Sequence, residues 1–269
     1  AEDCRRVVDG QQLVFMCAAT TSGAGAVATT PMIHVTPNVL MNTLILDAAY
    51  QAGVKKFLWL GSTTGYPPSG QREVKEEEMF DGEPYEAYYF SGWMKRFSET
   101  MCRMYGEKLA RPMTTIVLRP TNIYGPHDDF EPATSHVTPA LIRKVVERQD
   151  PLEVWGTGDD VRDVIYVDDM VEAMIKAMEK IEDYTAINVG LGKGYSVKEI
   201  LQAILELDGY ADAKLTFNPN KPSMIPIRLV DTAKAEECLD FKAETGLREG
   251  LEKTIRWYRE SLGSKVASN

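Results

Sequence analysis

Short apolar runs alternate with longer segments of helical periodicity along most of the chain. The runs that predict strands cover residues 12–19, 54–62, 113–120, 152–158, 162–169 and 184–190. The segments whose apolar spacing predicts amphipathic helices cover residues 36–53, 85–108, 136–149 and 170–181. Buried strands separated by helices predict a parallel sheet that is covered by helices on both faces.

The glycine-rich turn that usually opens a doubly wound sheet is missing from this pattern. Such a turn follows the first strand and holds the pyrophosphate of a dinucleotide. The segment SGAGAVAT at 22–29 has two close glycines but not the third that the motif requires. The opening residues resemble the end of a helix that precedes a middle strand. We therefore expect the first strand–helix–strand unit to lie outside this sequence or to be replaced by another element.

The C-terminal third has a more mixed pattern. Amphipathic helices are predicted at 194–209 and 247–262, on either side of a proline-rich connection at 218–231. We predict an α/β fold, a Rossmann-like doubly wound parallel sheet with a smaller C-terminal α/β substrate domain. The cofactor-binding part is predicted at 1–127 and 159–185, and the substrate part at 128–158 and 186–269.

Composition narrows the possible functions. A net charge of −10 argues against general nucleic-acid binding, which needs a basic face. No apolar run approaches the ~20 residues of a membrane span. The four cysteines are scattered without metal-ligand spacing, as in a reduced cytoplasmic protein. We therefore predict a cytoplasmic protein without a metal site, in which individual basic residues mark any site for an anion.

Two polar residues follow predicted strands at the edge where open parallel sheets bind ligands. Ser62 ends the strand at 54–62, although small polar residues also serve simply as turn formers. His136 follows a long polar loop, and Ser135 is placed to cap the next helix. The helix dipole there disfavours a charged imidazole. A single histidine in isolation is more often structural than catalytic.

Basic residues near the C-terminal strands are candidates for anion binding. Arg162 enters a strand after a glycine-rich turn and can hold a diphosphate bidentately. A surface ion pair with Asp159 or Asp160 is the alternative. Lys221 and Arg228, in the irregular connection, are further candidates for the same anion.

The segment YEAYYFSGWMKRFSE at 85–99 contains tyrosines but no lysine four residues after any of them. Such a pair shares one helix face and can form a proton donor. Lys95 lies seven residues after Tyr88, on the same face but ~10 Å along the axis. In another register Lys95 is the expected lysine, Ser91 replaces the tyrosine, and Tyr88 or Tyr89 must swing in. The remaining aromatic residues are predicted to pack inward: Phe90, Trp93 and Phe97.

Taken together, the motifs RPTNIYGPHDDF, SHV, WGTG and RDVIYVDDM resemble those of the extended short-chain dehydrogenase/reductase superfamily. This superfamily includes the NAD-dependent epimerase/dehydratase family, and within it the chain looks most like the GDP-L-fucose synthases. The resemblance runs from VFMCAA to GLEKTIRWYRESL. It implies a Rossmann-like fold, NAD or NADP as cofactor and a nucleotide-diphosphate sugar as substrate. By analogy with many relatives, it also implies a homodimer that pairs helices 36–53 and 85–108.

The resemblance also implies roles for individual residues. Ser62 matches the hydroxyl that bonds the sugar C4 oxygen, and His136 matches an acid/base used in epimerisation. Thr64 stands where the GDP-L-fucose synthases have a catalytic cysteine. The predicted catalytic residues are Ser62, Tyr88, Lys95 and His136. The predicted cofactor-binding residues are Ala18, Ala19, Asn38, Tyr88, Lys95 and Asn122. The predicted substrate-binding residues are Thr64, Asn122, Arg162, Lys221 and Arg228.

The expected reaction is hydride transfer at C4 of the sugar. A threonine cannot move a proton near neutral pH as a thiol can, so Thr64 argues against epimerisation at two carbons. C4 epimerisation, which needs only the tyrosine, is therefore the favoured interpretation. The alternatives are a reductase/epimerase of the GDP-L-fucose synthase type, a sugar-nucleotide-binding relative without activity, and a reductase of unrelated carbonyl compounds.

Overall fold

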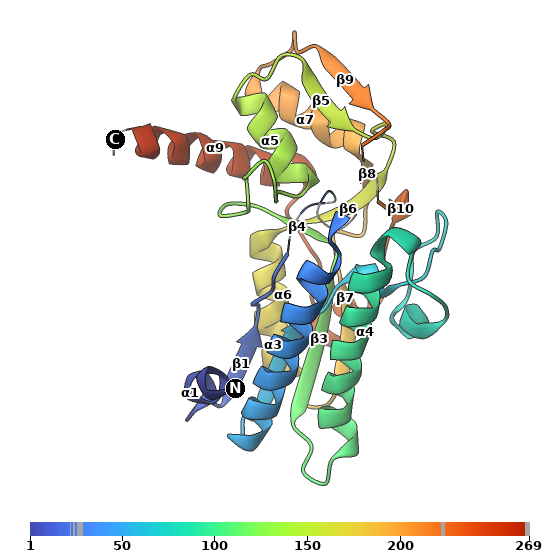
Figure 1. Cartoon of the computed structure of the whole chain (residues 1–269), viewed down its shortest axis with the longest axis vertical. Helices are drawn as coiled ribbons and strands as arrows, with labels where there is room; N and C mark the ends of the chain where they lie inside the picture. The colour runs from blue at the N-terminus through green and yellow to red at the C-terminus, as the bar shows by residue number, and fades with distance from the viewer. Residues whose placement is uncertain (22, 24, 26–28, 222–223, 267–269) are drawn as a thin grey trace.

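A computed structural model describes residues 1–21, 23, 25, 29–221 and 224–266 (Figure 1). Its central sheet is parallel, with the strand order β1-β2-β3-β7. These strands are Leu13–Met16, Lys56–Leu60, Thr114–Pro120 and Thr185–Val189. The predicted α/β fold with a parallel sheet is confirmed.

Helices cover both faces of this sheet because successive strand residues point to opposite sides. One face packs on α1 (Glu2–Val8), α3 (Met32–Gln51) and α4 (Tyr89–Arg103). The other face packs on α6 (Val167–Lys180) and α8 (Ala233–Leu239). Figure 1 shows α3 and α4 side by side on one face, with α6 behind the sheet. Strands buried on both faces explain the continuous apolar runs in the sequence.

A second group of elements lies beyond the carboxyl ends of the central strands, at the top of Figure 1. Helices α5 (Val137–Val146), α7 (Val197–Asp208) and α9 (Leu247–Val266) share one apolar core there. The pair β5 (Leu152–Trp155) and β9 (Leu215–Asn218) flanks them. A further sheet combines β4 (Asn122–Tyr124), β6 (Val161–Tyr166) and β10 (Ile227–Arg228) in parallel, with β8 (Gly194–Ser196) antiparallel to β6.

The predicted helix at 85–108 differs from the structure in its regularity. A 3₁₀ turn, η3 (Glu86–Tyr88), precedes α4, and a π-helical turn at Met104–Lys108 follows it. Gly92 lies where α4 meets the chain after β2, since a Cβ there would come within 2.8 Å of the Thr64 carbonyl oxygen. This glycine therefore brings the helix directly against the turn that carries Ser62.

The aromatic residues of α4 are not packed inward, so that prediction is wrong. Phe90, Trp93 and Phe97 are 48%, 40% and 46% exposed. The side of α4 that is buried instead carries Met94, Ser98 and Cys102. The helix is amphipathic, but its large rings lie on the outer face, and its buried side also carries the charged Arg96 and Glu99.

Strand β1 occupies an edge of the central sheet, whereas the sequence suggested a middle strand. Among the described residues it pairs only with β2. Its residues Leu13 and Phe15 are 48% and 43% exposed. The second hydrogen-bonding edge of β1 is thus open to a further strand. Part of the segment 22–29 lies outside the described residues.

Candidate active site

A cavity of about 700 Å³ lies between the carboxyl ends of the strands and the second group of elements. Predicted site residues from distant parts of the chain meet in its wall. They are Ser62, Thr64, Tyr88, Asn122, His136, Arg162 and Arg228. The structure therefore brings a serine hydroxyl, a tyrosine, a histidine and two arginines to the wall of one cavity, while their roles stay predictions.

Ser62 stands at the end of β2 and caps the 3₁₀ turn η1 (Thr63–Gly65). Its Oγ accepts hydrogen bonds from the Thr64 backbone N–H at 3.1 Å and from the Thr64 hydroxyl at 3.0 Å. A serine hydroxyl has two lone pairs and one proton. Because Thr64 uses both lone pairs, the Ser62 proton is left to donate to another group, and the cavity is beside it.

Lys95 lies under this turn and does not belong to the cavity lining given above. Its Nζ donates to the backbone carbonyls of Leu60 and Gly61, at 3.1 Å each, and lies 4.9 Å from the centre of the Trp59 ring. Burial lowers the pKa of Lys95 to about 8. The lysine thus fixes the end of β2 just before Ser62. Its direct role in proton transfer or cofactor binding stays a prediction.

Tyr88 lines the cavity at the junction of η3 and α4. Burial raises the pKa of its phenol, and the charges of Arg162 and Arg228 act in the opposite direction. Tyr88 is therefore a neutral hydroxyl close to the two arginines, while Lys95 binds the end of β2. In neither predicted register does the structure give a tyrosine–lysine contact among its described hydrogen bonds.

His136 is the residue that caps α5, in place of the predicted Ser135. Its side chain lines the cavity and is exposed to it. Protein atoms around the cavity still remove much of the bulk water from the imidazole. Desolvation therefore lowers the pKa of the imidazole, an effect that His34 adds to and Asp129 opposes. A neutral imidazole beside a cavity can accept a proton from a bound molecule.

Arg162 and Arg228 are direct neighbours in the parallel pair of β6 and β10. The alternative ion pair of Arg162 with Asp160 is present at 3.1 Å, with Arg162 itself only 7% exposed and the Asp160 side chain 25% exposed. Arg228 donates to the carbonyls of Tyr66 and Pro67, and burial lowers its pKa to about 10. Its buried Nε has no hydrogen-bond partner within the described structure. Two buried guanidinium groups side by side favour an anion with several oxygens.

Several predicted residues lie outside the cavity lining. Ala18 and Ala19 are exposed just after β1, whose carboxyl end adjoins that of β2. Asn38 is buried and holds this loop, because its amide exchanges hydrogen bonds with the backbone N–H and carbonyl of Thr20. Lys221 has its Nζ 5.3 Å from the centre of the Trp155 ring. The binding roles of these four residues stay predictions.

Sequence reasoning missed several lining residues, among them Asp128 and Trp155. Asp128 has a pKa raised to about 6 by burial, and its Oδ2 is buried without a partner among the described residues. Trp155 lines the cavity while remaining 40% exposed. Both stand inside motifs that were identified, GPHDDF and WGTG, but neither motif shows which of its side chains reaches the cavity.

The described part of the chain holds no group of three or more histidine, cysteine or acidic side chains arranged to bind a metal ion. It also holds no helix with the length and apolar character required to cross a bilayer.

The chemistry of the predicted cofactor-binding residues is compatible with a nicotinamide cofactor. Ala18 and Ala19 are small and exposed after β1, whose carboxyl end adjoins that of β2, and Ser62 and Asn122 line the cavity. The loop that carries the alanines is held by Asn38. These residues would adjoin the nicotinamide end of a dinucleotide, at the edge of the sheet where such ligands bind.

Comparison with known sequences identifies relatives along nearly the whole chain. Residues 1–190 match the NAD dependent epimerase/dehydratase family. A probable GDP-L-fucose synthase 1 of Oryza sativa subsp. japonica is 34% identical over 256 residues, which cover 93% of this chain and 76% of the relative. The GDP-L-fucose synthase of Escherichia coli K12 is 32% identical over 267 residues, covering 92% of this chain and 80% of the relative.

Solved structures show the same architecture. A UDP-glucose 4-epimerase from Thermotoga maritima, with UDP-glucose, superposes with a TM-score of 0.85 at 27% identity and covers 97% of this chain and 82% of its own. A GDP-6-OMe-4-keto-L-xylo-heptose reductase from C. jejuni has a TM-score of 0.87 at 25% identity, covering 97% of this chain and 86% of its own. A Rossmann-like fold is therefore confirmed.

Proposed function

The chain belongs to the NAD dependent epimerase/dehydratase family, and from this premise we propose that it is an NAD(P)-dependent nucleotide-sugar epimerase or reductase. The observation that carries the proposal is the cavity in which Ser62, His136 and the Arg162–Arg228 pair face one space. Hydroxyl and imidazole groups suit a sugar ring, and paired guanidinium groups suit a diphosphate.

The arrangement divides the substrate between two ends of the cavity. The diphosphate is held by Arg162 and Arg228, and the neutral Tyr88 hydroxyl donates beside them. The sugar then extends toward the end of β2. There Ser62 donates a hydrogen bond to the C4 oxygen, because its lone pairs are taken by Thr64. Tyr88, which lines the same cavity, would take the proton of the C4 hydroxyl in oxidation and return it in reduction. A bound NAD or NADP supplies or accepts the hydride at this carbon.

His136 extends the chemistry to a second carbon. Its neutral imidazole can remove a proton from a carbon next to a C4 keto group and return one. Thr64 has no comparable acid/base function near neutral pH, because an alcohol is far less acidic than a thiol. Oxidation and reduction at C4 with a single histidine acid/base is therefore the reaction that we propose. C4 epimerisation and reduction of a 4-keto sugar are its two outcomes.

A sugar-nucleotide-binding protein without activity is the second candidate. The observation in its favour is that Lys95 bonds backbone carbonyls, while the family pattern would place a lysine beside the tyrosine. Turnover separates the two candidates. NADPH consumption with a GDP-4-keto-6-deoxy sugar, or interconversion of UDP-glucose and UDP-galactose with NAD, establishes the enzyme. Binding of GDP or UDP with neither activity, and no tryptophan quenching by NADPH or NADH, establishes the binding protein.

We further propose that the chain forms a homodimer through α3 and α4, which pack side by side. Their outer face carries exposed apolar side chains, a composition typical of protein interfaces. These are Met32, Ile33, Leu40, Leu44, Tyr89, Phe90, Trp93 and Phe97. Sedimentation of the wild type and of a Phe90→Glu/Phe97→Glu variant tests this, and a wild-type monomer at micromolar concentration contradicts it.

We also propose that the chain divides into a cofactor part and a substrate part at the boundaries given above. Hydrogen exchange tests this division, because NADPH should protect amides of the cofactor part and GDP should protect amides of the substrate part. The cytoplasmic location rests on four unpaired cysteines, Cys4, Cys17, Cys102 and Cys238. Cell fractionation checks the location.

A further inference from the structure

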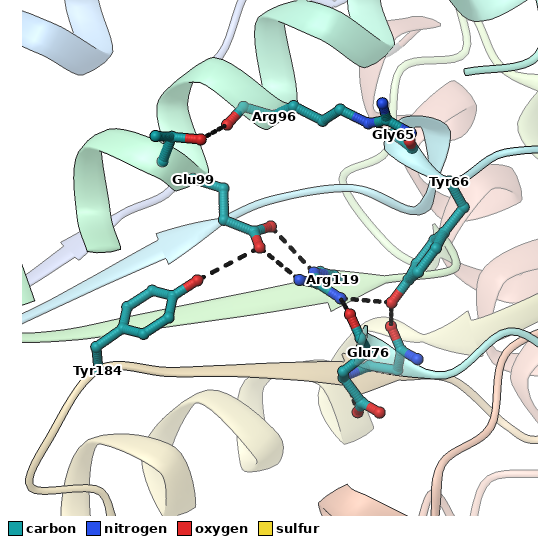
Figure 2. Close-up of polar contacts among 9 residues, drawn as sticks. Gly65, Tyr66, Glu76, Arg96, Glu99, Arg119 and Tyr184 are labelled. Atoms are coloured by element: carbon teal, nitrogen blue, oxygen red, sulfur yellow. Dashed lines mark hydrogen bonds and ion pairs between the residues drawn. The ribbon is translucent and has the colours of Figure 1, made fainter. Parts of the chain in front are cut away.

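A buried polar network lies under the cavity, and Figure 2 shows its members. At its centre is Arg119 of β3, which is 2% exposed. Its guanidinium forms a two-pronged ion pair with the Glu99 carboxylate of α4. It also donates to the Tyr66 hydroxyl at 2.6 Å and to the Glu76 carbonyl at 2.8 Å. One buried cation therefore ties together a strand, a helix and the segment that follows Ser62.

The Tyr66 hydroxyl is fixed in this network because it both accepts and donates a hydrogen bond. The oxygen accepts from Arg119, and the proton is donated to Asn188 Oδ1 at 2.6 Å. The Asn188 amide nitrogen in turn donates to the carbonyls of Val74 and Asp231. Tyr66 is completely buried, so its ring has a single position defined by these partners.

The other side of Tyr66 supports Arg228 of the cavity wall. The Tyr66 carbonyl accepts from Arg228 at 3.1 Å, and the adjoining Pro67 carbonyl accepts at 3.2 Å. The Arg228 guanidinium also lies 5.8 Å from the centre of the Tyr66 ring, and Arg119 lies 5.3 Å from the same centre. Arg228 is therefore held by neutral groups, two carbonyls and an aromatic face, which position its charge without neutralising it.

We propose that Tyr66 is a positioning residue that sets the location of Arg228, and thereby of the substrate diphosphate, relative to Ser62. This inference rests on the proposed function. Ser62 and Tyr66 belong to one short segment around η1, whose turn is closed by a hydrogen bond from the Tyr66 N–H to the Thr63 carbonyl at 3.2 Å. The same segment thus fixes the hydroxyl at the sugar end and the guanidinium at the diphosphate end.

The Tyr66→Phe variant tests this by removing one oxygen atom. Without the hydroxyl, Arg119 and Asn188 no longer hold the ring, and the carbonyls that seat Arg228 are free to shift. We expect the Kd of GDP, UDP and inorganic pyrophosphate to rise about tenfold, the equivalent of ~1.4 kcal/mol. The Kd of NADPH should stay within about twofold, a change equivalent to under ~0.5 kcal/mol.

Tyr184→Phe is a matched control. Its hydroxyl donates to the same Glu99 carboxylate at 3.4 Å, but it lies at the end of the network opposite Tyr66 (Figure 2). A general loosening of the core would affect both variants, whereas loss of positioning affects only Tyr66→Phe. We therefore expect unchanged Kd values for all three probes in Tyr184→Phe, with thermal unfolding recorded for both proteins.

Arg228→Lys completes the test as a double-mutant cycle. If Tyr66 acts through Arg228, the Tyr66→Phe/Arg228→Lys protein binds GDP no more weakly than Arg228→Lys alone. If Tyr66→Phe does not fold, Asn188→Ser is used instead, because it removes the acceptor of the same hydroxyl.

The outcomes separate the inference from the function on which it rests. Wild-type protein that binds none of the three probes overturns the proposed function. Wild-type binding that is unchanged in Tyr66→Phe, equally weakened in Tyr184→Phe, or additive in the cycle overturns the positioning role alone.

Discussion

The two ends of the cavity are built in different ways. At the end proposed for the sugar, Ser62 and Thr64 form one local turn directly after a strand, and their hydrogen bonds connect residues two apart. At the end proposed for the diphosphate, Arg162 and Arg228 come from strands far apart in the sequence and meet through strand pairing. The difference teaches that local backbone geometry positions the hydroxyl groups, while tertiary assembly positions the buried charges.

Loss of the Ser62 hydroxyl is expected to have the largest effect. A positioned proton donor contributes roughly 10²- to 10⁴-fold to a rate, so Ser62→Ala should lower kcat by that range. The Kd of GDP or UDP should stay unchanged, because the diphosphate end is separate. Steady-state kinetics and calorimetric titration measure the two quantities. Equal loss of binding and turnover would show that the two ends are not independent.

Loss of one arginine should weaken binding of the nucleoside diphosphate, the quantity that Ser62→Ala leaves unchanged. Arg228→Met removes a charged hydrogen-bond donor worth ~1.5–3 kcal/mol, so the Kd of the nucleoside diphosphate should rise roughly 10- to 100-fold. Binding of the nucleoside without phosphates should not change. Arg256→Met on α9 is the control, since that arginine is exposed and pairs with Glu252. Weaker nucleoside binding in Arg228→Met would assign the arginine to the base or sugar instead.

Gly92 tests how the sugar end depends on helix packing. In Gly92→Ala the new Cβ would lie 2.6 Å from Pro84 Cβ and 2.8 Å from the Thr64 carbonyl oxygen. Overpacking of this kind costs ~1–3 kcal/mol, and the better helix propensity of alanine offsets about 1 kcal/mol. We expect a lower free energy of unfolding in urea together with reduced kcat. Gly263→Ala, where no atom lies within 4 Å of the new Cβ, should not be destabilised.

The pH dependence should show the smallest effect. Desolvation lowers the pKa of His136 from 6.5, so the neutral, base-competent form persists below that pH. Exchange of a ring proton of the substrate with deuterated water should therefore remain active at pH 6.5 and decline as pH falls through the lowered pKa. Proton NMR follows the exchange, and His136→Asn removes it. An inflexion above pH 6.5 would contradict the environment described for His136.

Hydrophobic periodicity alone was enough to predict the alternation of strands and helices, and hence the parallel sheet. It also predicted the edge of the sheet at which Ser62 and His136 line one cavity. The carboxyl ends of parallel strands always share one edge, so local pattern was enough to place residues there. Motif resemblance indicated which polar residues at that edge to expect in the site. Boundaries differed where the backbone leaves the α-helical form, as at η3 and at the π turn after Arg103.

Tertiary structure decided the partners of each side chain. Lys95 binds the carbonyls that end β2, the rings of α4 face outward, and Tyr66 links Arg119 to Arg228. None of these contacts has a signal in sequence spacing, because each joins residues from separate elements. Periodicity reports which face of an element is apolar, but hydrogen bonds and buried charges depend on which element packs against that face.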